Sequence, residues 1–201
     1  MTFKIAYYIP GSIYGGAHNQ VCAMAPELKA QGFEEVIILP REPGDAADRL
    51  EENGLRVIRG TFLRPRATLN VVVNIKAAAN FIPQTLRLMH LLKRDSVELL
   101  QIHGLMCIDG LIAGLLAKVP VVWQIIDTRP PAILRLVFGP FLLLCDCVMT
   151  TGSIIGREYP FLNLHPRVRA FYPPVKRDSF SISSQERMEA RAQYQVRERD
   201  I

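Results

Sequence analysis

Short apolar runs alternate along this chain with longer stretches in which apolar residues recur every three or four positions. The short runs are rich in β-branched residues, which is typical of strands buried on both faces of a sheet. They predict strands at 3–9, 36–39, 55–58, 97–103, 119–126, 147–151 and 168–172. The longer stretches predict helices at 17–31, 70–94, 107–118 and 133–144.

The alternation of strands and helices predicts the fold class. Parallel strands need a crossover of helical length between them, and the predicted helices have that length. We therefore expect an α/β fold, a Rossmann-like, doubly wound and mainly parallel sheet with helices on both faces. Within it, Pro26 should bend the first helix and Pro83 should break the second, because proline cannot donate to the helical hydrogen-bond ladder.

The end of the chain differs in composition from the rest. Hydrophobic residues become sparse after Pro173 and Pro174, and 183–201 is rich in Glu and Arg. Ser183 or Ser184 could cap a solvated helix there. We expect a Rossmann-like domain over 1–176, followed over 177–201 by a linker and the helical start of a further, C-terminal domain.

Composition narrows the class of protein. The chain has 201 residues, a net charge of +5 and 49% hydrophobic residues, the balance of an ordinary globular protein. The longest apolar run, 132–149, is interrupted too often for a membrane-spanning helix, and the first residues lack the pattern of a signal peptide. The cysteines fit no zinc pattern, so we expect no metal site and a reducing, cytoplasmic location.

A glycine-rich loop lies between the first predicted strand and the first predicted helix. It contains Gly11, Gly15 and Gly16. Glycines let a ligand approach the backbone, and the N-terminus of a helix attracts anions such as a diphosphate. The spacing matches neither the dinucleotide fingerprint nor a P-loop. The simpler alternative, that the glycines only allow a tight turn, stays open.

Polar residues follow several of the other predicted strands. His103 ends the fourth strand, Asp127 follows the fifth, and Ser153 follows the sixth. The carboxyl ends of parallel strands meet at one edge of a sheet, where ligands of this fold class bind. These residues and the glycine loop therefore predict a pocket at that edge, although a single histidine at a strand end is more often structural.

Basic residues dominate the interval 53–94, which has no Asp or Glu. Such a run is usually a solvated face. Here Arg64 and Arg66 fall on a predicted loop, and Lys76 falls on a helix that mixes bases with apolar residues, a pattern that suits an anionic membrane surface. Nucleic acid is not expected as a partner, because bases and aromatic residues do not interleave.

Five stretches, taken in order, resemble the N-terminal domain of family 4 glycosyltransferases, which have the GT-B fold of two facing Rossmann-like domains. The stretches are 14–32, 98–104, 118–127, 145–153 and 171–180. The first contains Tyr14-Gly-Gly-Ala17, and the second ends in His103-Gly104. The sequence departs from the family's pattern at Phe33, where a His is usual, and at Pro173-Pro174, where Asn-Gly is usual.

This resemblance implies retaining transfer of a sugar from a nucleotide-sugar to an acceptor glycan or glycolipid, without a metal ion or other cofactor. It implies that Gly15, Gly16 and Ser153 lie by the donor diphosphate and sugar. His103 would contact the donor sugar, and Asp127 would border the acceptor, as catalytic candidates. The family's donor-binding domain has no counterpart in these residues. We therefore expect no transfer, or very slow transfer, without a separate C-terminal domain or subunit.

Two other functions fit the same pattern. One is a non-catalytic module of the same fold that binds an acceptor or a protein partner. The other is a nucleotide-dependent Rossmann oxidoreductase or epimerase. The loop spacing and the lack of an acidic residue closing the second predicted strand count against the latter.

Overall fold

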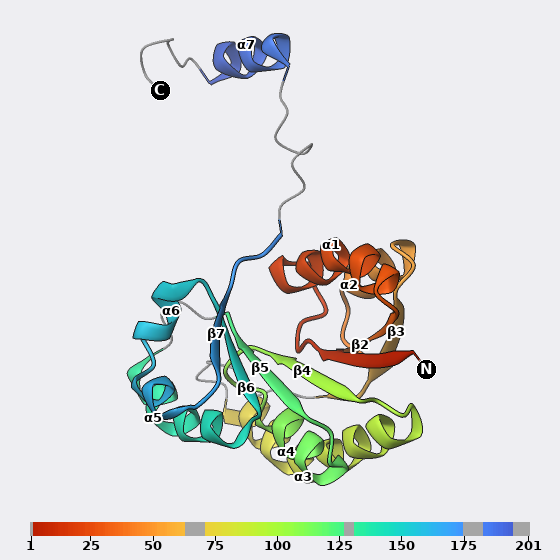
Figure 1. The fold of residues 1–201 in the computed structure, drawn as a ribbon, viewed down its shortest axis with the longest axis vertical. Coiled ribbons are helices and arrows are strands. Elements are labelled where there is room, and N and C mark those ends of the chain that lie inside the picture. The colour runs from red at the N-terminus through yellow and green to blue at the C-terminus, as the bar shows by residue number, and fades with distance from the viewer. Residues whose placement is uncertain (1, 63–70, 127–130, 175–182, 195–201) are drawn as a thin grey trace.

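The structure is a computed structural model, and it describes residues 2–62, 71–126, 131–174 and 183–194. Strands and helices alternate along most of the chain (Figure 1). The strands are β1 Phe3–Tyr8, β2 Phe33–Pro40, β3 Arg56–Gly60, β4 Leu99–His103, β5 Val121–Ile125, β6 Cys147–Thr151 and β7 Val168–Phe171. The helices are α1 Gly16–Ala30, α2 Ala46–Glu52, α3 Val71–Arg94, α4 Ile108–Ala117, α5 Ala132–Phe138, α6 Ser153–Arg157 and α7 Ser184–Gln193, with 3₁₀ turns η1 Gly139–Leu144 and η2 Pro160–Leu164.

The strands form one parallel sheet in the order β3-β2-β1-β4-β5-β6-β7. On one side of β1 lie β2 and then β3. On its other side β4 pairs with β1, and β5, β6 and β7 follow in order. The strand order therefore reverses between β1 and β4, which is the place where doubly wound sheets bind ligands. The predicted Rossmann-like, doubly wound α/β fold is confirmed.

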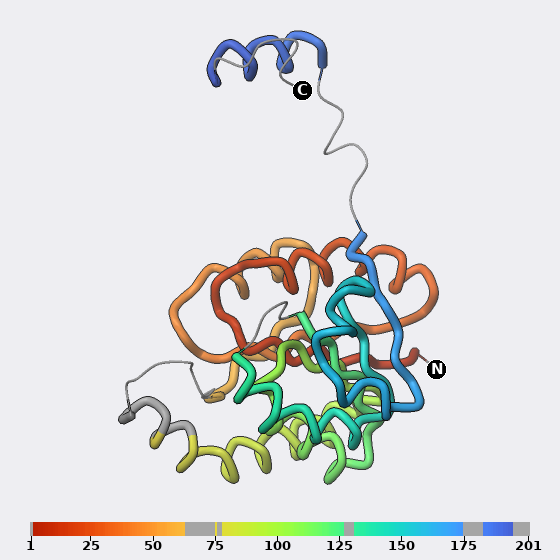
Figure 2. Tube along the Cα trace, turned by 90° about the vertical axis from the view of Figure 1, so that its left-hand side faces the viewer, coloured from red at the N-terminus to blue at the C-terminus, as the bar shows by residue number. Residues whose placement is uncertain are grey.

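Helices cover both faces of the sheet. In Figure 1, α1 and α2 lie over one face of β1, β2 and β3, and α3, α4 and α5 lie over the opposite face; Figure 2 shows the same two layers from the side. Alternate residues of β1 serve the two layers: Tyr7 packs in the core under α1 and α2, while Tyr8 packs in the core against α3 and α4. The Tyr8 hydroxyl donates to Asp109 of α4 at 2.6 Å.

Proline affects the helices less than its sequence position predicts. α3 runs through Pro83 as one helix, so the predicted break there is wrong. The second half of α3 is held by tertiary contacts: Leu88 and Leu92 are fully buried, and Gln84 donates to Asp109 at 3.1 Å. Packing of this kind outweighs the single hydrogen bond that a proline removes.

Two element boundaries also differ from the prediction. The predicted helix 133–144 is divided, because α5 ends at Phe138 and Gly139 begins η1, in which Pro140 occupies an early position. The second strand starts earlier than predicted, so Glu34 and Glu35 lie within β2. Glu35 is buried there, with only 8% of its surface exposed.

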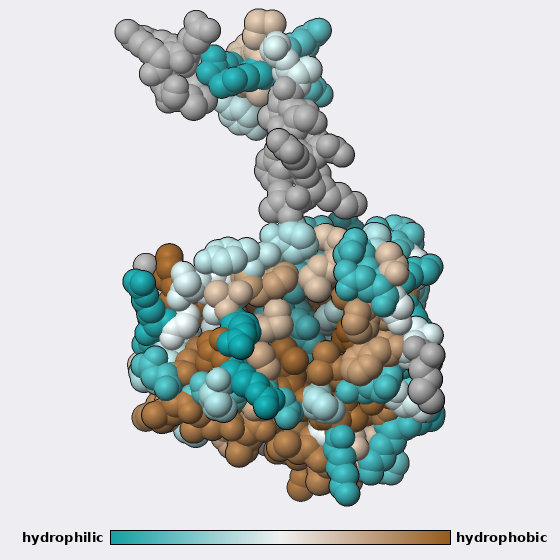
Figure 3. Space-filling model, in the orientation of Figure 1, coloured by the Kyte–Doolittle hydropathy of each residue, from teal (hydrophilic) through white to brown (hydrophobic). Residues whose placement is uncertain are grey.

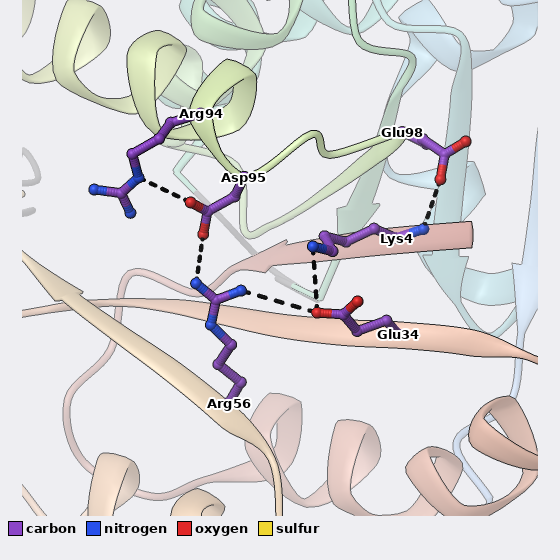
Figure 4. Close-up of polar contacts among 6 residues, drawn as sticks. All are labelled: Lys4, Glu34, Arg56, Arg94, Asp95 and Glu98. Atoms are coloured by element: carbon purple, nitrogen blue, oxygen red, sulfur yellow. Dashed lines mark hydrogen bonds and ion pairs between the residues drawn. The ribbon is translucent and has the colours of Figure 1, made fainter. Parts of the chain in front are cut away.

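A network of ion pairs joins the amino ends of the strands (Figure 4). Asp95 accepts from Arg56 of β3 and from Arg94 of α3, each at 2.9 Å. Glu34 lies 3.3 Å from Lys4 and 3.9 Å from Arg56. Two bases of the acid-free interval, Arg56 and Arg94, are therefore paired with acids from outside it.

The last described element is α7, and none of its residues is buried. Ser183 caps it, because its hydroxyl accepts from the Glu186 N–H while Glu186 accepts from the Ser183 N–H, as the sequence predicted. The division at 176 lies in a segment outside the described residues and stays a prediction. Among the described residues, no helix is long and apolar enough to cross a membrane.

Candidate functional site

A cavity of about 270 Å³ lies at the carboxyl edge of the sheet, where the strand order reverses. The residues after β1, the first turn of α1 and the residues after β4 form its wall, and Ile126 adds a contact after β5. The cavity brings together Gly15, Gly16 and His103. Three of the residues that the sequence selected for a pocket thus line a common cavity.

The glycines of the loop are not needed for its backbone conformation. Gly15 has an extended φ of −157°, and neither Gly15 nor Gly16 has a positive φ. A Cβ added at Gly16 would meet nothing within 4 Å, and one at Gly15 would meet only the Ile13 carbonyl at 3.9 Å. A tight turn therefore does not explain these glycines. Because Gly15 and Gly16 have no side chains, the backbone at the start of α1 is open to the cavity.

The backbone at the start of α1 can receive an anion. The first N–H groups of a helix have no partner within the helix, and the helix dipole adds positive charge there. No acidic residue occupies the first turn of α1. This arrangement suits phosphate oxygens.

His18, in the first turn of α1, holds the glycine loop in shape. Its Nδ1 accepts from the Gly15 N–H at 3.1 Å, so its Nε2 carries the proton and donates to the Gly11 carbonyl, also at 3.1 Å. Tyr14 stacks on the ring, with Arg49 above the Tyr14 face. Burial lowers the pKa of His18, which favours the neutral ring that this bridge requires.

His103 is fully buried and forms part of the cavity wall. Burial, with a smaller contribution from nearby His18, lowers its pKa to about 3, so the imidazole is neutral at physiological pH. Its Nδ1 has no hydrogen-bond partner within the part of the chain that the structure describes. Leaving a buried polar group unpaired costs about 1–3 kcal/mol, which marks this atom as one that a ligand could satisfy.

A chain of buried amides runs beneath the cavity. Gln101 lies two residues before His103 on β4, and Gln124 pairs with His103 in the register of β4 and β5. Gln20 of α1 and Gln124 exchange two hydrogen bonds, at 2.8 and 3.0 Å. Gln101 donates to Gln124 at 2.6 Å, and its amide nitrogen lies 3.3 Å from His103 Nε2. The amides therefore tie α1, β4 and β5 together directly under His103.

Other predicted site residues lie away from this cavity or outside the described residues. Ser153 follows β6 on the same edge of the sheet but is exposed and does not line the cavity. Asp127, Arg64 and Arg66 lie outside the described residues. Lys76 falls within α3, but its side chain is not described.

Four residues around the cavity were not predicted from the sequence: His18, Gln20, Gln101 and Gln124. A signal for two of them exists in the sequence. Gln101 and His103 are polar residues at alternate positions of an otherwise apolar buried strand, and Gln124 repeats this feature on the next strand. Buried polar side chains on one face of a sheet must pair with each other or with a ligand.

Comparisons with known proteins support the fold. No protein-family model matches the sequence, and no curated protein matches it significantly. Among solved structures, a glycosyltransferase from Rickettsia africae ESF-5 superposes with a TM-score of 0.70 at 13% identity, over 98% of this chain and 51% of that one. MurG from Acinetobacter baumannii superposes with a TM-score of 0.57 at 16% identity, over 75% and 42% of the two chains.

A third similar structure is a UDP-N-acetylglucosamine 2-epimerase, with a TM-score of 0.56 and 13% identity over 83% of this chain and 46% of the other. The chain thus spans about half the length of each of these three solved chains. At these identities the likeness establishes the fold. The chain has the Rossmann-like fold of the N-terminal half of a GT-B protein.

Proposed function

We propose that this chain is the acceptor-side half of a nucleotide-sugar glycosyltransferase of the family 4 type. It would work in the cytoplasm in retaining transfer from a nucleotide-sugar to a glycan or glycolipid, without a metal ion. The observation that carries the proposal is the cavity, which joins an unobstructed helix N-terminus at Gly15 and Gly16 to the unpaired buried Nδ1 of His103.

The chemistry of the cavity fits sugar transfer. Negative charge grows on the departing diphosphate in the transition state, and backbone N–H groups at a helix N-terminus stabilise such charge. His103 is neutral and cannot act as a strong base with a pKa of about 3. Its role in this proposal is to hold the sugar or phosphate by a hydrogen bond, while the groups that bind the nucleotide belong to a separate domain or subunit.

A titration of the isotope-labelled chain tests this role. UDP-, GDP- and ADP-sugars should bind weakly and shift the amide resonances of Gly15, Gly16 and Ala17. Shifts confined to another part of the molecule would refute the proposed site. Tight binding, or rapid sugar transfer by this chain alone, would contradict the assignment of the nucleotide site to a second half.

Two alternatives share the fold and make different predictions. An epimerase is favoured by the 2-epimerase neighbours. It would convert UDP-N-acetylglucosamine to its C2 epimer, which chromatography of the sugar products would detect. A non-catalytic module would bind an acceptor or a protein with no nucleotide-sugar effect at the glycine loop, even after a donor-binding partner is added.

We also propose that the helical face formed by α3, α4, α5 and η1 contacts an anionic membrane. Figure 3 shows apolar surface gathered on this side of the molecule. Among the described side chains of this face, the large apolar ones that are exposed are Ile75, Ile82, Leu86, Leu115, Leu116, Ile133, Leu136, Val137, Leu143 and Leu144. By sequence, these elements contain a single acidic residue, Asp109, and it is buried. The exposed charges there are basic, including Arg87 and Lys93, so the face combines apolar and cationic groups.

Vesicle sedimentation tests the membrane contact. Leu136→Glu places a charge on the apolar face at a position that is 67% exposed and should weaken binding to anionic vesicles strongly. Met188→Glu is a matched control on α7, at a position that is 65% exposed, and should bind like the unmodified chain. Equal binding to neutral and anionic vesicles would refute the electrostatic part.

A further inference from the structure

The geometry points to the buried amides Gln101 and Gln124 as positioning residues that fix His103 in its Nδ1–H form and so present a hydrogen-bond donor to the ligand. This inference rests on the proposed function, because it assigns the chemistry of the same cavity. It predicts that the ligand atom at His103 is an oxygen acceptor, such as a sugar hydroxyl or a phosphate oxygen.

The mutual contacts of the amides fix their orientations relative to one another. Gln124 Oε1 lies 3.0 Å from Gln20 Nε2 and 2.6 Å from Gln101 Nε2, so one carbonyl oxygen accepts from two amide nitrogens. Gln124 Nε2 in turn donates to Gln20 Oε1 at 2.8 Å and faces the Thr151 hydroxyl at 3.4 Å. If the amide of Gln101 alone were rotated by 180°, Gln101 Oε1 would lie 2.6 Å from Gln124 Oε1. Repulsion between the lone pairs of the two oxygens disfavours this orientation.

The orientation of Gln101 then determines the tautomer of His103. The Gln101 amide nitrogen lies 3.3 Å from His103 Nε2 and can only donate. His103 Nε2 must therefore accept, and the proton of the neutral ring is on Nδ1. Nδ1 is the atom that lacks a partner within the described residues, so the network leaves one donor for the ligand.

The two histidines of the site have opposite tautomers by this reasoning. His18 carries its proton on Nε2 because Gly15 donates to its Nδ1. His103 carries its proton on Nδ1 because Gln101 donates to its Nε2. One ring shapes the glycine loop and the other offers a hydrogen bond, so neither is free to act as a base.

One rearrangement would reverse the tautomer. If Gln20, Gln101 and Gln124 all turned over together, their mutual hydrogen bonds would persist, but Gln101 Oε1 would face His103 and require Nε2–H. Gln101→Glu should impose this state, because a carboxylate can only accept. Gln124 would then donate to the new carboxylate, and His103 would donate to it through Nε2.

Nitrogen NMR of the histidine rings in the ¹⁵N-labelled 201-residue chain tests the inference directly. Comparison with His103→Gln assigns the resonances of this ring. At neutral pH the unmodified chain should show a protonated Nδ1 and an unprotonated Nε2, and Gln101→Glu should reverse them. The control Gln193→Glu makes the same change on exposed α7 and should leave the ring unchanged. Nε2–H or an imidazolium in the unmodified chain would overturn the inference, even if the variant fails to fold.

A second measurement follows the ring nitrogen resonances of His103 as a ligand is added. Saturating UDP-glucose should shift the Nδ1–H resonance, and Gln101→Glu should bind this ligand about five- to tenfold more weakly, the effect of one lost hydrogen bond. A shift at the glycine loop without a shift at Nδ1 would overturn the ligand role of His103 but leave the proposed function standing. No shift at either place, with Nδ1 protonated, would instead refute the proposed function.

Discussion

Replacement of Glu35 by glutamine should change how the stability of this protein depends on pH. Glu35 lies on β2, is 8% exposed, and has one carboxylate oxygen with no hydrogen-bond partner among the described residues. Burial raises the pKa of its carboxyl group to about 7, against an ordinary value of 4.5, although a hydrogen bond with Tyr7 opposes the rise. Glutamine keeps the shape of this side chain and removes its titration.

The sign and size of the effect follow from proton linkage. Between about pH 4.5 and pH 7 the folded protein keeps a proton on Glu35 that the unfolded chain has released. Folding therefore loses stability as pH rises through this window, by up to about 3 kcal/mol for a difference of about 2.5 pKa units. Glutamine has no such loss, so Glu35→Gln should gain this amount relative to the unmodified protein as pH rises.

The difference between the two proteins isolates this carboxyl group. His18 and His103 have lowered pKa values and contribute stability that grows as pH rises, the opposite sign, but they contribute equally to both proteins. Urea unfolding followed through Trp123 fluorescence, from about pH 4.5 to about pH 8, gives both curves. Glu34→Gln is the control, because Glu34 is the next residue on β2 but lies in an exposed ion pair with Lys4.

Parallel stability curves for Glu35→Gln and the unmodified protein would refute the reasoning. They would mean that water or a basic group reaches Glu35 in the folded protein and that its carboxylate is not desolvated. A pH-dependent gain in Glu34→Gln of the same size would also refute it, because the effect would then reflect net charge and not burial.

Three further predictions concern the cavity and the ends of the sheet. Gly16→Ala should change stability by no more than about 1 kcal/mol, because its Cβ meets open space, yet weaken nucleotide-sugar binding in the amide titration. Asp95→Asn should cost about 1–3 kcal/mol at neutral pH in urea unfolding, because it weakens the hydrogen bonds from Arg56 and Arg94. The pKa of Asp95 is lowered chiefly by the Arg94 hydrogen bond, so this cost should begin to decrease below about pH 4 and be lost as pH falls through the lowered pKa. Trp123→Phe should cost about 2–3 kcal/mol by circular dichroism, because it leaves a void and unpairs the Gly104 carbonyl that the indole contacts at 2.8 Å.

The fold was accessible from the sequence because its signals are local and repeated. Apolar runs and helical periods recur along the chain, and parallel strands joined by helices allow few topologies. The general position of the candidate site could be predicted in the same way, because the carboxyl ends of parallel strands all lie at one edge of the sheet. The boundaries that failed were set by non-local contacts, as at Pro83, where packing of Leu88 and Leu92 against the core keeps α3 continuous.

The details of the site depend on contacts that sequence spacing does not encode. His18 matters because its ring bridges Gly15 and Gly11, which requires the loop to fold back over the start of α1. The glycines predicted either a ligand-binding loop or a tight turn. The structure shows that a tight turn does not require them, because the φ of Gly15 is extended and the space beside Gly16 is open.

Polar residues inside apolar strands provide a test that sequence analysis can apply in advance. Gln101, His103 and Gln124 share the face of the sheet that α1 covers, and burying such groups is unfavourable unless each one is paired. Three amides with two donors and one carbonyl each can satisfy one another and one ring nitrogen. They cannot also satisfy the second nitrogen of that ring, Nδ1 of His103. A buried histidine is also not required for the stability of a strand. The unpaired ring nitrogen of His103 is therefore the atom at which we propose a ligand, and this proposal rests on the pairing of the buried side chains and not on likeness to known proteins.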